Sequence, residues 1–242
     1  MVKKKPNCII TDTYFKETLH QNIPYRSDVE IEEWKHKWTP KKVRRRKYGY
    51  VTYKLISESR SFPDSSFEHK ALTIALRQWG LRTKEIRFKR VTGKADLVCK
   101  FATKDQDSYF KDKPNVLAYA YFPNGGEIGG DMTFNDSIWW SDDGQPVNAH
   151  ELQPDTYPAN TRTKIKTYNL IHVMIHEAGH AIGLKHHPSC RECVMFPFYS
   201  GKVLLHEHDI IRVQSFYGKR SLSQQIIEYF RRRMTRKWGG GE

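Results

Sequence analysis

The sequence has no long apolar run and little cysteine. No apolar stretch in its 242 residues approaches the roughly 18 to 20 residues that a membrane-spanning helix needs. The first residues, MVKKKPNCIITDTYF, are basic but contain neither a continuous apolar segment nor a small-residue cleavage site, so we read no signal peptide. The four cysteines, Cys8, Cys99, Cys190 and Cys193, are too few for a disulfide-based scaffold in a chain of this size. These absences exclude a helical membrane protein and a small disulfide-rich domain.

Basic residues, in contrast, are abundant, and the formal net charge is +14. They concentrate in residues 39–49, 81–90 and 230–238. Such clusters attract nucleic acid, anionic membranes or acidic partners. Because no nucleic-acid-binding motif accompanies them, we interpret them mainly as solvated surfaces and tails, with contact to a polyanion as the alternative.

The chain divides into three parts. Residues 1–45 form a basic N-terminal extension or pro-segment, residues 46–218 carry the strong patterns of a folded domain, and residues 219–242 form a basic C-terminal helix and tail. Within the middle part, alternation predicts a strand in residues 48–56, and residues 86–91, 95–102 and 115–123 are interpreted as three more strands. The glycine-rich stretch 124–135 is expected to contain one further short strand. Helical spacing predicts helices in residues 65–80, 167–183 and 206–218.

The stretch IHEAGHAIGLKHH places several metal-binding side chains at meaningful spacings. His176 and His180 are four residues apart, so on a helix both imidazoles face the same metal ion. Glu177 lies about 100 degrees around the helix, close enough to reach a metal-bound water without being a ligand. Gly183 permits a sharp turn that brings back His186 as a third ligand. Three histidines leave the fourth position of a tetrahedral zinc open, which is typical of a catalytic site.

The pattern His-Glu-x-x-His-x-x-Gly-x-x-His followed by a methionine resembles the metzincin zinc peptidases, and among them the matrixins, the matrix metalloproteinase catalytic domains. Other segments resemble matrixin elements in the same order: VTYKLI, ALTIALRQWG, ADLVCKFA, NVLAYAYFPNGGEIGGDMTFNDSIWW, VMFPFYSG and DIIRVQSFYGKR. The resemblance spans about residues 46–218. It implies an α+β fold of the metzincin or zincin-like type. In that fold a twisted, mostly parallel five-stranded sheet is combined with an active-site helix and a small C-terminal subdomain after the third zinc histidine.

The resemblance also implies an activity. The chain would be a zinc-dependent metalloendopeptidase that hydrolyses peptide bonds of protein substrates, with one catalytic zinc held by His176, His180 and His186. Glu177 would be the general base, and Met195 would be a packing floor beneath the zinc. The alternative is a catalytically silent zinc-binding protein that acts as a basic module for nucleic acid or other polyanions. We expect a monomer without a transmembrane segment, and the family suggests a secreted or extracellular location.

The resemblance assigns substrate contacts to five further residues. The backbone around Leu117 and Ala118 would pair with an extended substrate as an added strand. Pro197 and Tyr199 would shape the wall of the pocket for the side chain after the cut. His172 stands where the family places a residue at the base of that pocket. A histidine there could shorten the pocket or make it pH-sensitive, or it could simply pack on the helix.

Two metal sites of the matrixins are altered in this sequence. The family's second, structural zinc is held by three histidines and an aspartate, and the matching positions are Gln106, Asp107, Tyr119 and Thr133. Since only the aspartate remains, we predict that this zinc is absent and that packing by Tyr119, Phe134 and Trp139 replaces it. The calcium site is partly preserved, because Asp112, Gly129 and Asp131 remain as candidate ligands whereas Asn135 and Ile138 replace acidic ones.

Three of the cysteines have candidate roles. The spacing of Cys190 and Cys193 allows a small disulfide or half of a metal site. Because no second cysteine pair is available, we expect a local disulfide or two free thiols. The segment PNCIITD resembles the matrixin latency motif Pro-Arg-Cys-Gly-Val-Pro-Asp and keeps Pro6, Cys8 and Asp12 at the same spacing. Cys8 is therefore a candidate latency switch, and an ordinary exposed cysteine is the alternative.

Overall fold

The computed structural model of the chain describes residues 8–11, 38, 50–62, 66–123 and 127–221, and for residues 8–11 it describes the backbone alone. Most of the predicted N-terminal extension lies outside these residues. So do the predicted C-terminal helix and the basic clusters at 39–49 and 230–238.

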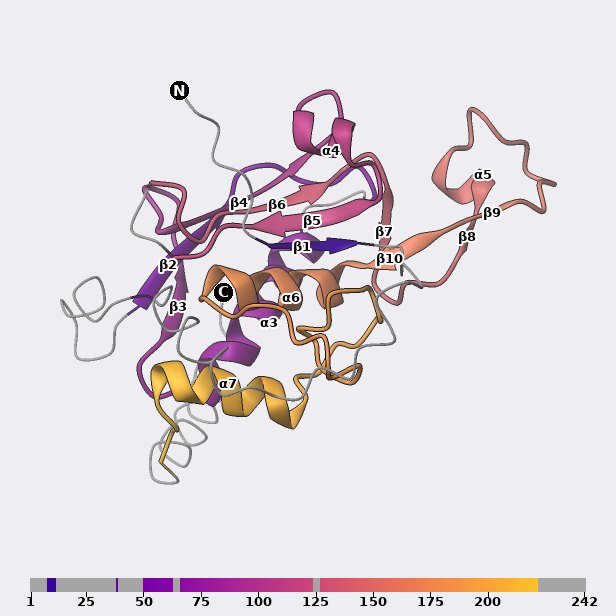
Figure 1. The fold of residues 1–242 in the computed structure, drawn as a ribbon. Coiled ribbons are helices and arrows are strands. Elements are labelled where there is room, and N and C mark those ends of the chain that lie inside the picture. Colours follow the sequence, from indigo (N-terminus) through magenta and orange to yellow (C-terminus); the bar gives the residue numbers. More distant parts are fainter. Residues whose placement is uncertain (1–7, 12–37, 39–49, 63–65, 124–126, 222–242) are drawn as a thin grey trace, which may run out of the picture.

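A twisted sheet forms one layer of the fold (Figure 1). The five predicted strands are all present, as β2 Tyr50–Leu55, β3 Arg87–Arg90, β4 Leu97–Ala102, β5 Val116–Ala120 and β6 Met132–Asn135. Neighbouring strands are parallel from β3 through β2 and β4 to β6, and β5 runs antiparallel to β6. The α+β class and the mostly parallel sheet are therefore as predicted.

A sixth strand, which the sequence did not predict, extends the sheet. Residues Cys8–Thr11 form β1, which pairs antiparallel with β5 at the edge of the sheet. Ile10 aligns with Ala118, but Thr11 aligns with Val116, so the register shifts by one residue between these two pairs. The strand lies between β5 and the helix α6 described below, and it contacts both (Figure 1).

The long helices lie together on one side of the sheet (Figure 1). They are α3 Ser66–Arg82, α6 Leu170–Ala181 and α7 Glu207–Tyr217, and the short helices are α4 Ser108–Asp112 and α5 Ala149–Leu152. Helix α3 packs against both α6 and α7. Trp79 of α3 is completely buried, and its indole N–H donates to the carbonyl of Ile175 in α6, 2.9 Å away. None of the described helices combines the length and the apolar character needed to cross a membrane.

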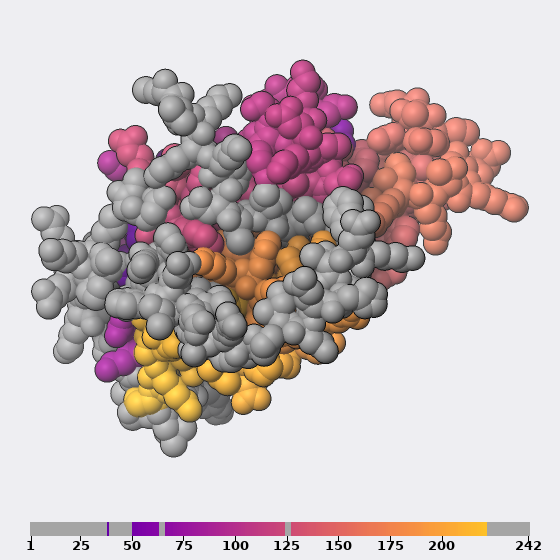
Figure 2. Space-filling view, in the orientation of Figure 1, coloured from indigo at the N-terminus to yellow at the C-terminus, as the bar shows by residue number. Residues whose placement is uncertain are grey.

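Two small sheets lie outside the main one. Strands β7 Trp139–Ser141 and β10 Thr167–Asn169 pair in parallel, and β10 leads directly into α6. Strands β8 Val147–Asn148 and β9 Lys164–Ile165 pair antiparallel and, with α5, form a lobe that projects from the body of the protein (Figure 2).

Trp38 is anchored in the core, although it belongs to the segment interpreted as an extension. Its side chain is 5% exposed, and its indole N–H donates to the carbonyl of Ala181, 2.9 Å away. Its backbone N–H donates to the hydroxyl of Tyr217, which in turn donates to the carbonyl of Ile182. Residue 38 therefore joins the end of α6 to the end of α7.

Candidate active site

Helix α6 supplies the first part of the site. Asn169 caps it, since its side chain accepts the N–H of His172 at 3.0 Å. Every residue of α6 except Ile171 is buried, because the helix lies between the sheet and α3. The helix stops at Ala181, and Gly183 then adopts φ 107°, a conformation that side-chain-bearing residues rarely adopt. This turn redirects the chain toward His186.

The three predicted zinc histidines converge. The Nε2 atom of His176 lies 3.0 Å from Nε2 of His180 and 3.2 Å from Nε2 of His186. Two nitrogen ligands on a tetrahedral zinc, each about 2.0 to 2.1 Å from the metal, are separated by roughly 3.3 Å. The spacing and the chemistry of these three donors thus fit one zinc ion. Glu177, between two of them in the sequence, is completely buried.

Backbone carbonyls fix how the two helix histidines present their rings. Nδ1 of His176 lies 2.7 Å from the carbonyl of Val194, and Nδ1 of His180 lies 2.6 Å from the carbonyl of Leu184. Since a carbonyl only accepts, each Nδ1 carries the proton and each Nε2 keeps its lone pair. Burial, followed by the neighbouring histidines, holds the pKa of His176 and His180 well below the usual value. Both rings are therefore neutral, as metal binding requires.

Met195 is buried, and its side chain packs against α6 at Gly179. A Cβ atom added to Gly179 would collide with the Met195 sulfur and lie 3.0 Å from the ring of Trp79. The absence of a side chain at Gly179 thus lets Met195 pack closely against the helix. Its role as a packing floor beneath a zinc ion stays a prediction.

Replacing Gly179 with alanine is expected to lower the free energy of unfolding. Overpacking of a filled core costs about 1–3 kcal/mol, whereas the better helix propensity of alanine returns about 1 kcal/mol at most. The net loss should lower Tm by a few degrees, which calorimetry of the two proteins measures. The matched control is Gly93→Ala, because a Cβ there meets no atom within 4 Å. An unchanged Tm for Gly179→Ala would contradict this packing.

Asp209, which the sequence analysis missed, ties α7 to the chain around Met195. Its carboxylate accepts the N–H of Val194 at 2.7 Å and of Met195 at 3.3 Å, and it accepts the N–H of His206 at 3.1 Å. The ring of His206 accepts the backbone N–H of His208. The side chains of His206 and Asp209 together form a capping box at the start of α7. The available signal was the spacing His206-x-x-Asp209 before a helical pattern, a capping box with histidine in place of serine.

The pocket residues assigned by resemblance lie together at the start of α6. The rings of Tyr199 and His172 are 5.1 Å apart, and the Tyr199 hydroxyl accepts the N–H of Asn169 at 2.8 Å. Nδ1 of His172 is 2.5 Å from the carbonyl of Lys202. Pro197 is half-buried in the same loop. Burial, the largest cause, lowers the pKa of His172 to about 4, so the ring is neutral above pH 5. Packing is therefore favoured over a pH switch near neutrality.

Acidification should destabilise the protein partly through His172. Its ordinary pKa is 6.5 and its folded pKa is about 4, so between these values the unfolded chain binds a proton that the folded chain rejects. Stability is therefore lost as pH falls, by about 2 kcal/mol between about pH 7.5 and pH 5 from this residue. His172→Asn does not titrate, and its unfolding free energy in urea should fall less over this range. Parallel pH profiles for the two proteins would contradict the assignment.

The sheet edge that was predicted to pair with substrate carries β1. Leu117 and Ala118 are buried in β5, and Ala118 aligns with Ile10 of β1, whereas Leu117 lies at the register shift. This edge therefore accepts an antiparallel strand. The backbone of Cys8 aligns with Ala120, and its side chain lies outside what the structure describes.

Residues at the altered matrixin metal positions form hydrogen bonds with other residues of the chain. Tyr119 donates its hydroxyl to the carboxylate of Asp107 at 2.7 Å, and the side-chain oxygen of Gln106 accepts the N–H of Thr103. Tyr119 and Phe134 are buried, and Thr133 is buried beside them, as the packing prediction requires. Trp139 is half-buried, with the Arg60 guanidinium 4.5 Å from its ring. The absence of the second zinc stays a prediction.

Two residues at the candidate calcium site also form hydrogen bonds within the chain. Asp131 accepts the N–H of Val98 at 2.8 Å, and Asn135 donates to the carbonyl of Val116 at 2.9 Å. Asp112 is exposed, Gly129 is buried, and Ile138 packs against the core. Calcium binding also stays a prediction. Cys190 and Cys193 form a disulfide, one of the two predicted states, and Cys99 is a buried free thiol.

Comparison with known proteins places this site in a family. The sequence model of the family described as Matrixin matches residues 37–218. Human matrilysin is 30% identical over 233 residues, which cover 93% of this chain and 70% of that protein. Mouse stromelysin-1 is 28% identical over 187 residues, 74% of this chain and 34% of that protein. Matrix metalloproteinase-2 of Drosophila melanogaster is 30% identical over 174 residues, 69% of this chain and 20% of that protein. The chain therefore belongs to the matrixins, a metzincin family of zinc metalloproteases.

Proposed function

We propose that this protein is a zinc-dependent endopeptidase that cleaves protein substrates, with His176, His180 and His186 as ligands of one catalytic zinc. The observation that carries the proposal is the convergence of three imidazoles, with the Nε2 atoms of His180 and His186 at 3.0 and 3.2 Å from that of His176. Bound there, zinc would polarise the scissile carbonyl and lower the pKa of its water toward 7.

Glu177 is proposed as the general base. It follows His176 directly and is completely buried, so its carboxylate is shielded from bulk solvent. Its carboxylate would take a proton from the attacking water and return it to the leaving amine. Met195 and Asp209 would act as positioning residues. Met195 packs against Gly179 of the helix that carries two of the histidines, and Asp209 holds the backbone of Val194, whose carbonyl orients His176.

The edge of β5 is proposed to align the substrate. A peptide added antiparallel to Leu117 and Ala118 would lie beside α6, as β1 does in this structure. Tyr199, Pro197 and His172 would then border the pocket for the side chain after the cut. Because β1 occupies this edge, we also propose that the N-terminal segment restrains the enzyme, with Cys8 as the candidate thiol ligand of the zinc.

Removing the metal should abolish cleavage. We expect full-length protein stripped with a chelator to lose cleavage of a quenched matrixin-type peptide, and to regain it with one added zinc per chain. His180→Gln should lose activity by at least about 100-fold, because one of three ligands is missing. His150→Gln is the matched control, since this histidine lies in the projecting lobe. The proposal would be contradicted if cleavage persisted after chelation, or if His180→Gln cleaved the peptide at the wild-type rate.

A further inference from the structure

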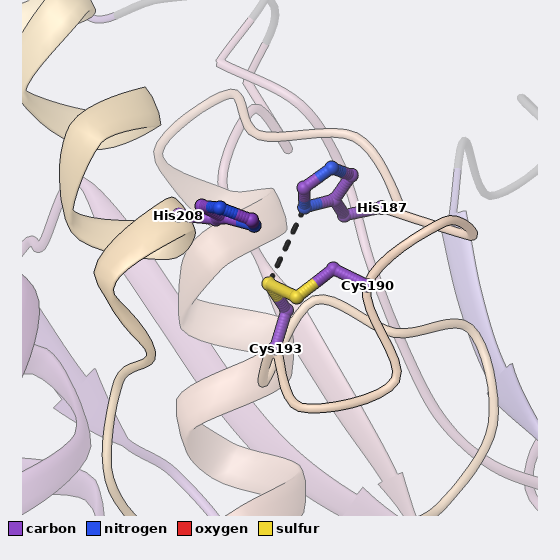
Figure 3. Close-up of side chains that lie close together, drawn as sticks. All are labelled: His187, Cys190, Cys193 and His208. Atoms are coloured by element: carbon purple, nitrogen blue, oxygen red, sulfur yellow. Dashed lines mark hydrogen bonds between the residues drawn. A yellow bond between two sulfur atoms is a disulfide. The ribbon is translucent and has the colours of Figure 1, made fainter. Parts of the chain in front are cut away.

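A second group of metal-binding side chains lies beside the site (Figure 3). His187, Cys190, Cys193 and His208 each offer a ligand atom, and these atoms all lie within 4.8 Å of one another. Three of the residues come from the loop that follows His186, and His208 comes from the first turn of α7. The first three are buried and His208 is exposed. In Figure 3 the four side chains point toward one another across the gap between loop and helix.

The loop is folded to present its ligands together. The N–H of Cys190 donates to the carbonyl of His187 at 3.1 Å, and the N–H of Cys193 donates to the carbonyl of Cys190 at 3.1 Å. Two consecutive tight turns thus bring the side chains of residues 187, 190 and 193 to the same side of the loop. Nδ1 of His187 is already 3.3 Å from the sulfur of Cys193. The Cys-x-x-Cys pair followed after 14 residues by a histidine is also a spacing used by zinc sites.

We infer that His187, Cys190, Cys193 and His208 bind a structural zinc ion when the two cysteines are reduced. Two thiolates and two imidazoles are a complete tetrahedral set, so this site would be closed, unlike the three-histidine site. Zn–S distances of about 2.3 Å and Zn–N distances of about 2.0 to 2.1 Å put neighbouring ligands roughly 3.3 to 3.8 Å apart. The His187–Cys193 spacing fits this range without rearrangement.

His208 is assigned as the fourth ligand in preference to His206. Nδ1 of His206 lies 3.7 Å from both sulfur atoms, but it already accepts the N–H of His208 as part of the cap on α7. Using it as a ligand would release that cap. The ring of His208 lies 5.6 Å from that of His187, centroid to centroid, so both can face one ion.

The disulfide form and the metal form exclude each other. Opening the Cys190–Cys193 disulfide takes two electrons and two protons and gives two thiols. A phosphine supplies the electrons and becomes a phosphine oxide with the oxygen of water. The divalent ion then displaces both thiol protons, and the complex of Zn²⁺, two thiolates and two neutral imidazoles carries no net charge, which suits a mostly buried site. In this form the ion would join the loop that carries His186 to helix α7.

Cobalt binding to the full-length chain tests the inference, because Co²⁺ replaces zinc and its thiolate complexes have a strong charge-transfer absorption in the near ultraviolet. Every protein in this test carries Cys8→Ser, because Cys8 is the candidate thiol ligand of the three-histidine zinc. The phosphine-reduced Cys8→Ser protein, first stripped of metal, is expected to show this absorption and to bind one more Co²⁺ per chain than its disulfide form. Cys190→Ser/Cys193→Ser should lack the absorption in either state. His208→Gln should weaken binding of the absorbing Co²⁺ at least about 10-fold, whereas His69→Gln, a histidine on α3, should leave it unchanged.

Two outcomes would overturn the inference. One is reduced Cys8→Ser protein without the absorption, because this protein keeps all four proposed ligands. The other is an absorption that persists when Cys190→Ser and Cys193→Ser are added, which would assign it to Cys99, the one cysteine left. Failure of the proposed peptidase function is a separate result, since the three-histidine site of the Cys8→Ser protein has no sulfur ligand and does not contribute to this absorption.

Discussion

Glu177→Gln is expected to abolish cleavage while leaving metal binding intact. Glutamine preserves the size of the buried side chain but cannot take a proton from water. Loss of general-base catalysis costs typically 10²- to 10⁴-fold, so kcat should fall by this factor with little change in KM. The measurement is the rate of cleavage of a quenched matrixin-type peptide beside metal content by mass spectrometry. The side chain is completely buried, so the thermal unfolding of both proteins must be compared as well.

The control for this experiment is Glu151→Gln. Glu151 is an exposed glutamate on the short helix α5, in the projecting lobe. The Glu151→Gln variant should keep the full activity and metal content of the wild type. If Glu177→Gln retains more than about a tenth of the wild-type rate while binding metal normally, Glu177 is not the base, because even the lower bound for general-base catalysis exceeds this loss. If the variant binds no metal, its lost activity reports on the site rather than on the proton transfer.

The parts of the fold that sequence predicted are those whose signals are local. His176 and His180 are four residues apart on a helix whose other residues are nearly all apolar, and Gly183 marks its end. Each of these signals lies within one turn or one loop. The strands β2 to β6 alternate or form short apolar runs between turns, so their residues alone suggested them.

The parts that sequence did not predict depend on contacts between distant segments. The residues of β1 are only four, Cys8–Thr11, and what makes them a strand is the free edge of β5 more than 100 residues later. Trp38 was assigned to an extension because its partners, Ala181 and Tyr217, are far away in sequence. His208 was not grouped with the two cysteines for the same reason, because it lies on α7. His187 stands next to the cysteine pair in the sequence, and its role depended on this fourth, distant ligand.

Removing residues 1–30 is expected to raise kcat/KM by roughly 10- to 100-fold. The strand β1 occupies the edge of β5 that a substrate would use, so only the fraction of molecules in which β1 has dissociated can bind substrate. The expected increase corresponds to a β1–β5 interaction of about 1.4–2.8 kcal/mol. The deletion ends before Trp38, because Trp38 bonds to both Ala181 and Tyr217 and its loss would disturb the ends of α6 and α7. Cleavage of a quenched peptide by the two proteins measures the effect.

Two single substitutions in the full-length chain separate the causes of such restraint. Ile10→Pro removes one backbone N–H from β1 and disfavours its pairing, so it should activate the enzyme if the strand itself blocks the edge. Cys8→Ser should activate it only if the thiol binds the zinc. Activation by the deletion and by Ile10→Pro, with no effect of Cys8→Ser, would mean that the backbone of this segment competes with substrate and that the cysteine is incidental. Equal rates for the deletion and the full-length protein would show that β1 leaves the edge readily and restrains nothing.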